Sequence, residues 1–294
     1  MFTGSLVAIV TPMQPDGAID FAAWQRLIDF HIANGTNGIV VGGTTGESAT
    51  LRESELRELT ERACKQAQGR IPIIAGAGTS STASTVERVR WLSELPIDGL
   101  LIVTPAYNRP TQEGLYRHFA AAVEATRVPV ILYNIPSRTA VDLLPATVAR
   151  LAQLKGVVGV KEGVAQITRI RELVAASRGD FVVLSGDDAT TRESVLAGAK
   201  GVISVTANVA PRAMSDMVAA AMKGNAGEAE RLDRMLAALH RDLFLEANPI
   251  PVKWALERIG LMGGAMRLPL TELSQGHHSQ VLSALHQAGV HTTT

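Results

Sequence analysis

Short apolar runs alternate along this chain with longer stretches whose apolar residues recur at helical spacing. The runs are rich in valine and isoleucine and lack polar alternation, which is typical of parallel strands buried on both faces. They lie at 5–11, 38–41, 71–76, 98–104, 128–134, 156–161, 181–186 and 201–206. A candidate helix follows each run, starting near Asp20, Arg52, Thr82, Thr111, Leu144, Ala165, Ala189 and Pro211.

This alternation predicts an α/β fold. Eight strand–helix units fit a closed (β/α)8 TIM barrel, which typically takes about 250 residues. An open doubly wound sheet stays possible, because periodicity does not show closure. From residue 225 onward the pattern is helical only, so we expect a catalytic barrel over 1–224 and a helical C-terminal region over 225–294. Thr190 and Glu193, which follow Asp188, have the spacing of a capping box at a helix start.

The charge balance and the cysteine content limit which partners and which cellular compartment we expect for this protein. Lysine plus arginine and aspartate plus glutamate both total 28, so the formal net charge is zero, without the basic run that nucleic acid or anionic membranes favour. Cys64 is the only cysteine, which excludes an intramolecular disulfide. The first residues have no basic segment, and the apolar run at 6–10 is too short for a signal sequence. We expect a soluble cytoplasmic protein with small-molecule substrates.

The strongest candidate for chemistry is Lys161, at the end of the sixth run. Active-site groups of such barrels come from the C-terminal ends of strands. An apolar strand end can lower a lysine pKa from ~10.4 toward the ~7–8 that attack on a carbonyl needs at neutral pH. The neighbouring Glu162 should point to the opposite face. A solvated lysine that caps the strand is the alternative; the position favours a Schiff-base nucleophile.

Two of the three tyrosines also follow strands. Tyr133 lies near the end of the fifth run and Tyr107 follows the fourth, whereas Tyr116 lies in a helical pattern. Imine chemistry needs repeated proton transfers, and a phenol can both donate and accept a proton. Aromatic residues of the barrel wall with satisfied hydroxyl groups are the alternative interpretation.

The segment GGTTGES at 42–48 resembles a phosphate loop only superficially. Three residues separate Gly42 from Gly46, and Glu47 stands where a P-loop has lysine. We interpret the segment as a nest of backbone N–H groups, with hydroxyl groups from Thr44 and Thr45, suited to a carboxylate. A glycine-rich loop before a helix remains the alternative.

Arg138, in NIPSRT, is the natural partner for a second carboxylate, because its planar guanidinium binds one bidentately. A solvated loop charge is the alternative. Asp187 and Asp188 suggest helix capping more than a metal. The seven histidines, which include His277 and His278, show no spaced ligand set, so we expect neither metal nor cofactor.

These motifs together carry a family resemblance. GGTTGES, TPAYNRPTQEGLYRHF, ILYNIPSRT, GVVGVKE, LSGDD and GVISVTAN occur in this order. The chain resembles the dihydrodipicolinate synthases, within the class I pyruvate-dependent aldolases, over essentially its whole length. The resemblance implies condensation of pyruvate with L-aspartate 4-semialdehyde to 4-hydroxy-tetrahydrodipicolinate, on the route to lysine and diaminopimelate.

The resemblance also implies roles for single residues. Lys161 would form the imine with pyruvate, and Tyr133 would be the general acid and base, linked through Thr44 to Tyr107. Further positions would bind the substrates. Thr45 and the backbone at Ile203 would hold the pyruvate carboxylate, and Arg138 would hold the semialdehyde carboxylate. Gly186 would lie beside them.

Assembly and regulation follow from the same resemblance. In the family, the tyrosine matching Tyr107 comes from a neighbouring subunit, and tetramers built as pairs of tight dimers are usual, so a homotetramer is implied. Relatives that lysine inhibits bind it with histidines, an asparagine, a glutamate and a tyrosine. The matching positions here are Glu53, Leu56, Ser80, Ser84 and Ala106. We therefore expect weak or absent inhibition by lysine.

Two alternative functions are weighed against this one. N-acetylneuraminate lyases and 2-keto-3-deoxy sugar acid aldolases share the lysine–tyrosine pair and the nest. Tyr107 and Arg138 favour a small amino-acid aldehyde over a polyol chain. A non-catalytic barrel that binds pyruvate-like acids is expected to lack the lysine or the tyrosine, and both are present.

Overall fold

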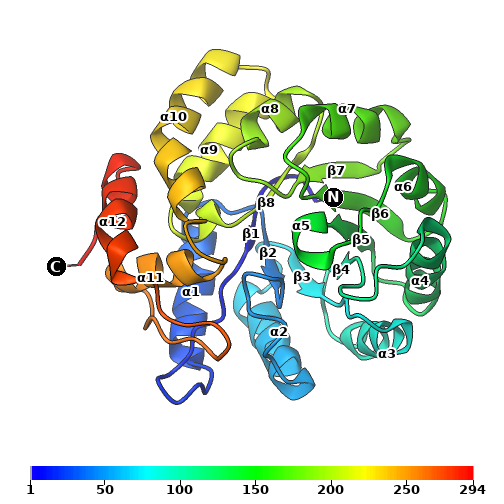
Figure 1. Cartoon of the computed structure of the whole chain (residues 1–294), viewed down its shortest axis with the longest axis horizontal. Helices are drawn as coiled ribbons and strands as arrows, with labels where there is room; N and C mark the ends of the chain where they lie inside the picture. The colour runs from blue at the N-terminus through cyan, green and yellow to red at the C-terminus, as the bar shows by residue number, and fades with distance from the viewer. Residues whose placement is uncertain (1, 294) are drawn as a thin grey trace.

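A computed structural model describes residues 2–293. In this part of the chain, eight parallel strands pair in sequence order, and the first pairs with the last, which closes the barrel (Figure 1). The strands are β1 Gly4–Ala8, β2 Gly38–Val41, β3 Ile73–Gly76, β4 Gly99–Val103, β5 Val130–Asn134, β6 Val157–Glu162, β7 Val182–Ser185 and β8 Gly201–Ser204. The predicted barrel is confirmed, and the open sheet is excluded.

Helices surround the sheet on its outer face (Figure 1). Along the barrel they are α1 Phe21–Ala33, α2 Glu53–Ala67, α3 Thr82–Leu92, α4 Gln112–Glu124, α5 Pro136–Thr139, α6 Pro145–Leu151, α7 Ile167–Ala176, α8 Thr191–Leu196, a 3₁₀ turn at Thr206–Asn208 and α9 Pro211–Met222. The eight predicted helix starts lie within two residues of observed ones. The short helix α5, which contains Arg138, was not predicted.

Side-chain caps explain several of these starts. The side chains of Asp20, Ser81 and Thr111 each accept a hydrogen bond from a backbone N–H in the first turn of the following helix. The predicted capping box at Thr190 and Glu193 is wrong.

The hydrogen bonds at the start of α8 explain the error. Asp187 accepts from the Thr190 N–H at 2.9 Å and from its hydroxyl at 2.8 Å, so the Thr190 side chain is already engaged. Glu193 instead pairs with Arg192. Asp188 caps a different segment, because it accepts from the N–H groups of Val205 and Thr206.

The C-terminal region is helical, as predicted. It contains α10 Ala226–Asp242, α11 Ile250–Arg258, a 3₁₀ turn at Gln275–His277 and α12 His278–Gln287. In Figure 1, α10 lies beside α9 and α12 lies at the margin of the molecule. Their apolar side chains share one core with the first strands and helices, and Leu239, Trp254 and Leu285 belong to the same cluster as Val7 and Trp24. The division at 224 and 225 stays a prediction, and the core continues across it.

A separate apolar cluster fills the inside of the barrel. It includes Leu6, Val40, Ile74, Ile131 and Leu184, which are fully buried. Among the described helices, none is both long and apolar enough to cross a membrane.

Candidate active site

Lys161 and Tyr133 lie side by side inside the barrel. They are register partners at the ends of β6 and β5, and the Lys161 ammonium nitrogen lies 4.3 Å from the centroid of the Tyr133 ring. Each residue is 6% exposed. The structure therefore brings the two main catalytic candidates together at a position that is shielded from solvent.

A bulge in β6 sets which way Lys161 faces. Val130 pairs with Val157 and Ile131 pairs with Gly159, so Val158 is an extra residue in β6. One inserted residue reverses the alternation of side chains along the rest of a strand. A Cβ at Gly159 would lie 2.5 Å from a methyl carbon of Val182, so glycine is required there. The bulge could not be predicted from the sequence, because every residue of this strand before Lys161 is apolar or glycine.

Glu162 faces the opposite side of the strand from Lys161, as expected for its neighbour. Its side chain accepts hydrogen bonds from the Val164 N–H at 2.7 Å and from the Asn134 amide at 3.1 Å. Arg169, on α7, lies 3.9 Å away. Burial raises the pKa of the Glu162 carboxyl from 4.5 to about 7, although these hydrogen bonds oppose the shift. The charged Glu162 is therefore kept away from the Lys161 amine.

The raised pKa predicts a pH-dependent stability. Between the unfolded pKa of 4.5 and the folded pKa of about 7, the folded protein holds a proton on Glu162 that the unfolded chain has released. The free energy of unfolding should therefore fall as the pH rises through this interval, by on the order of 3 kcal/mol. Urea unfolding from pH 4.5 to pH 8 measures it, with Glu162→Gln as the reference. Identical slopes for both proteins would contradict the assignment.

The loop at 42–50 was predicted to be an anion nest, and its hydrogen bonds bear on that prediction. Its backbone turns on itself, with Gly46 and Ser48 donating to the Gly43 carbonyl. Within residues 2–293 the N–H groups of Thr44 and Thr45 have no hydrogen-bond acceptor. Free N–H groups at a turn bind carboxylates. The loop thus has two backbone donors without an acceptor in the described part of the chain, and the anion nest stays a prediction.

A buried ion pair behind this loop was not predicted. The Glu47 carboxylate pairs with the ammonium of Lys253 on α11, and both side chains are fully buried. Glu47 has a φ of 58°, in the left-handed region. Burial lowers the pKa of the Lys253 ammonium, and the Glu47 charge opposes that shift. The C-terminal region therefore fixes the loop from behind. The residues are far apart in sequence, so no local pattern marks the pair.

Removing one charge of this pair should strongly destabilise the protein. The variant Lys253→Met leaves the Glu47 carboxylate buried without its partner, which typically costs about 3–5 kcal/mol. The free energy of unfolding in urea measures this cost. Arg117→Met is the matched control, since Arg117 and its partner Glu113 are 78% and 50% exposed and such pairs contribute at most about 1 kcal/mol. Equal effects of the two substitutions would contradict the interpretation.

Asn248, from the same C-terminal region, links two predicted substrate-binding residues. Its side-chain amide donates to the Thr45 hydroxyl at 3.0 Å, and its backbone carbonyl accepts from the Arg138 guanidinium at 3.0 Å. Arg138 otherwise lies exposed on α5. Thr45 is buried, at 2% exposure. The structure thus places the two candidate carboxylate partners on either side of Asn248.

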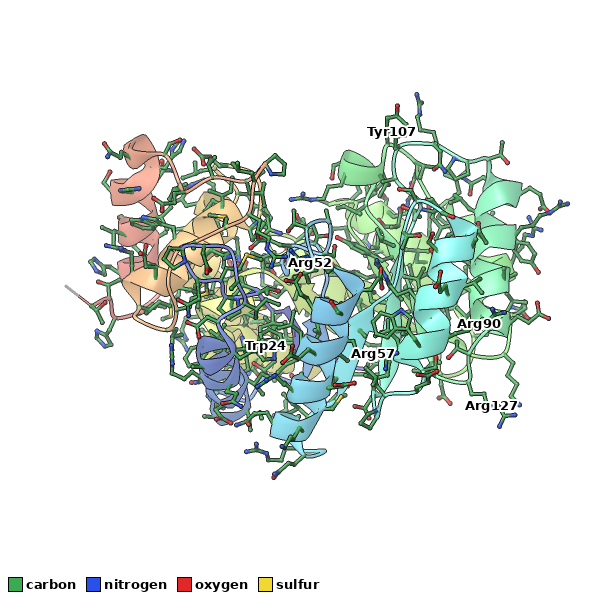
Figure 2. The ribbon with its side chains drawn as sticks, turned by 90° about the horizontal axis from the view of Figure 1, so that it is seen from below. Trp24, Arg52, Arg57, Arg90, Tyr107 and Arg127 are labelled. Atoms are coloured by element: carbon green, nitrogen blue, oxygen red, sulfur yellow. The ribbon has the colours of Figure 1, made fainter. Side chains whose placement is uncertain are left out.

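Tyr107 lies away from the other candidates. It is 95% exposed with a φ of 76°, and Figure 2 shows it at the outer edge of the molecule. Within the described residues no hydrogen bond joins Tyr133, Thr44 and Tyr107. The predicted proton relay is therefore not formed by hydrogen bonds within one chain.

Two candidates remain. Ile203 lies on β8 and belongs to the cluster inside the barrel. Gly186 follows β7, and its N–H already donates to the Glu162 carbonyl at 2.6 Å. A Cβ at Gly186 would lie 2.9 Å from that same oxygen, so the position requires glycine for close packing.

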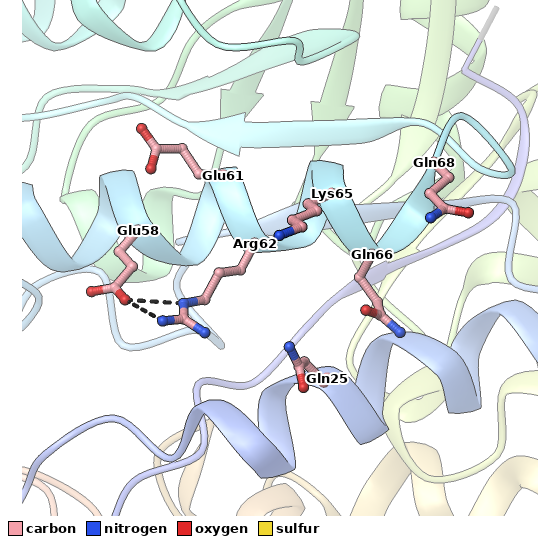
Figure 3. A pocket seen from close by; sticks show the side chains of 7 residues that line it. All are labelled: Gln25, Glu58, Glu61, Arg62, Lys65, Gln66 and Gln68. Atoms are coloured by element: carbon pink, nitrogen blue, oxygen red, sulfur yellow. Dashed lines mark hydrogen bonds and ion pairs between the residues drawn. The ribbon is translucent and has the colours of Figure 1, made fainter.

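A polar surface pocket lies beside the Glu58–Arg62 ion pair, away from these residues (Figure 3). It is lined by residues of α1 and α2 and by Gln68, and it contains none of the candidate site residues.

Comparisons with known proteins agree on one family. The model of the dihydrodipicolinate synthetase family matches residues 1–288. A 4-hydroxy-tetrahydrodipicolinate synthase of Alkalilimnicola ehrlichii is 55% identical, over 98% of this chain and 99% of its own. The crystal structure of the dihydrodipicolinate synthase of Acinetobacter baumannii, complexed with pyruvate, is 46% identical with a TM-score of 0.97, over 99% of this chain and 100% of its own. The enzyme of Aquifex aeolicus is 41% identical with a TM-score of 0.97, over the whole of both chains.

Proposed function

Since this chain belongs to the dihydrodipicolinate synthase family, we propose that Lys161 is the residue on which its reaction begins. The activity is that of a 4-hydroxy-tetrahydrodipicolinate synthase, which condenses pyruvate with L-aspartate 4-semialdehyde. The observation that carries the assignment of Lys161 is its place: a buried amine at the end of a barrel strand, 4.3 Å from a tyrosine ring.

The Lys161 amine attacks the keto carbon of pyruvate, and loss of water gives an imine. Tyr133, whose ring centroid lies 4.3 Å from the Lys161 nitrogen, supplies and removes protons in these steps. Removal of a proton from the pyruvate methyl group then gives an enamine, whose carbon bonds to the aldehyde carbon of the second substrate. Both substrate carboxylates remain unchanged, so each needs a fixed partner.

The loop at 42–50 and Arg138 supply these partners. The unbonded N–H groups of Thr44 and Thr45 support binding of the pyruvate carboxylate, together with the backbone at Ile203. Gly186 lets the backbone after β7 pack closely on the end of β6, which carries Lys161. Arg138 pairs with the carboxylate of the semialdehyde.

Arg138→Ala should selectively weaken the binding of the second substrate, L-aspartate 4-semialdehyde. Loss of a charge-assisted contact typically costs about 1.5–3 kcal/mol, so kcat/KM for the semialdehyde should fall about 10- to 100-fold while the KM for pyruvate changes little. Steady-state kinetics with each substrate varied in turn measures both. Arg127→Ala, at an exposed loop position, is the control. An equal rise in both KM values would contradict the role.

The exposed Tyr107 supports assembly with further copies of this chain. We propose a homotetramer in which Tyr107 completes the relay through Thr44 in a neighbouring subunit. Sedimentation of the purified protein tests the assembly. A single cysteine, which allows no intramolecular disulfide, supports a cytoplasmic location.

One comparison tests the acceptor substrate. The purified protein is given pyruvate with L-aspartate 4-semialdehyde, and separately N-acetylneuraminate or a 2-keto-3-deoxy sugar acid. We expect rapid turnover only in the first assay. Faster cleavage of a sugar acid would assign the protein to that branch of the superfamily instead.

A further inference from the structure

A buried polar pair lies directly behind the two catalytic candidates. Asn134 follows Tyr133 on β5, Glu162 follows Lys161 on β6, and the two are register partners just as Tyr133 and Lys161 are. Asn134 is fully buried and Glu162 is 1% exposed. The Asn134 amide donates to both Glu162 carboxylate oxygens, at 3.1 Å each. We name Asn134 and Glu162 the strand-end pair.

Each member of the strand-end pair is also tied to the loop that follows its own strand. The Asn134 side-chain oxygen accepts from the Leu143 N–H at 2.9 Å. One Glu162 oxygen accepts from the Val164 N–H at 2.7 Å. The bonds therefore join two strand ends and two loops through a single side-chain contact.

A second layer of charge holds the strand-end pair from the outside. Asn134 also donates to Asp142 at 2.7 Å, and Asp142 accepts two hydrogen bonds from Arg169. The charged groups that face the pair are thus Asp142 and Arg169, while the Lys161 amine lies on the other side of β6. Every polar atom of the strand-end pair has a partner.

Stability alone does not require this arrangement. A buried carboxylate costs desolvation, and apolar residues of similar volume often stabilise a core better than buried charge. The outward positions just before the strand-end pair, Leu132 and Val160, are apolar and fully buried. A saturated polar network does rigidify the backbone that carries it.

We propose that Asn134 and Glu162 are positioning residues, which hold the ends of β5 and β6 so that Tyr133 and Lys161 keep the orientation needed for proton transfer. This inference rests on the proposed function. A displacement of about 1 Å at a reacting group can lower the rate about 100-fold. A local break in the strand-end pair should therefore lower kcat, even though neither residue touches the substrate.

Reversing the polarity of the pair tests it. In Asn134→Asp, a carboxylate faces the carboxylates of Glu162 and Asp142 in place of an amide donor, so at pH 8 we expect kcat to fall about 10- to 100-fold. Activity should return as the pH is lowered, because the two carboxyls then share a proton. Adding Glu162→Gln to this variant removes the repulsion at position 162 and restores an amide–carboxylate hydrogen bond there. The new carboxylate still faces Asp142, whose charge Arg169 pairs, so kcat at pH 8 should recover by about tenfold.

A structural control separates positioning from general loss of stability. Thr36→Val removes a buried hydrogen bond to His31, of 3.0 Å, ahead of β2 at the opposite end of the barrel. We expect it to lower the urea midpoint without changing kcat or the pH profile. Should Asn134→Asp not fold, Glu162→Gln alone places an amide against an amide, and a pH-independent fall in kcat is expected.

The outcomes are distinct. Borohydride with pyruvate is applied to the unchanged protein first, and a failure to modify Lys161 there would defeat the proposed function itself. If Lys161 is modified but the Asn134→Asp variant keeps the original kcat and pH profile, the positioning role is wrong. It is equally wrong if the double variant loses as much kcat as the single one, or if Thr36→Val, at a similar loss of urea midpoint, lowers kcat as much as Asn134→Asp does.

Discussion

Replacing Lys161 with methionine is expected to lower kcat by at least about 10³-fold, because covalent catalysis ends when its nucleophile is removed. Methionine is similar in length and apolar, so it can fill the same buried space beside Tyr133. The folded protein should therefore keep its urea midpoint. Activity with pyruvate and L-aspartate 4-semialdehyde, measured at equal protein concentration, gives the ratio.

Lys155→Met is the matched control for this substitution. Lys155 lies just ahead of β6 and is exposed, so the same chemical change there removes a solvated charge only. Its kcat should stay within about twofold of the original. A Lys161→Met protein that keeps a substantial part of its activity would show that catalysis does not pass through this amine.

Tyr133→Phe is expected to give the second largest effect. The change removes only the hydroxyl group, so the ring that lies against Lys161 remains. Loss of general acid and base catalysis typically lowers kcat about 10²- to 10⁴-fold. The pyruvate adduct on Lys161 should form more slowly but still form, because the nucleophile is intact.

The control for Tyr133→Phe is Tyr116→Phe, on α4. The Tyr116 ring lies under the guanidinium of Arg150, on the outside of the barrel. This substitution should leave kcat unchanged, since it removes a hydroxyl far from the reacting atoms. Equal kinetics for the two variants would exclude Tyr133 as the proton donor.

The barrel and the Lys161–Tyr133 pair could be predicted because their signals are local. Apolar runs and helix starts recur in order along the chain. Active-site groups of such barrels lie at the C-terminal ends of the strands, so a reactive residue at a strand end is a candidate for catalysis. The short helix α5 could not be predicted from the sequence, because four residues are too few to show a helical period. The bulge at Val158 could not be predicted either, because a run in which every residue is apolar has the same hydrophobic pattern in both registers.

The support of the site could not be predicted from local pattern. Glu47 and Lys253 are far apart in the chain, as are Thr45 and Asn248, and the packing of the C-terminal region against the barrel brings them together. The capping box at Thr190 had the right spacing, but Asp187 offered a competing acceptor. Distant pairs and competing partners depend on tertiary structure, and spacing does not report them.

The most direct test of the account is the identity of the lysine that reacts with pyruvate. The protein is incubated with pyruvate, reduced with borohydride, digested and analysed by peptide mass spectrometry. We expect a single carboxyethyl-lysine, at Lys161, which is absent without pyruvate and absent from the Lys161→Met variant. An adduct at another lysine, or none while the condensation activity is intact, would contradict the account.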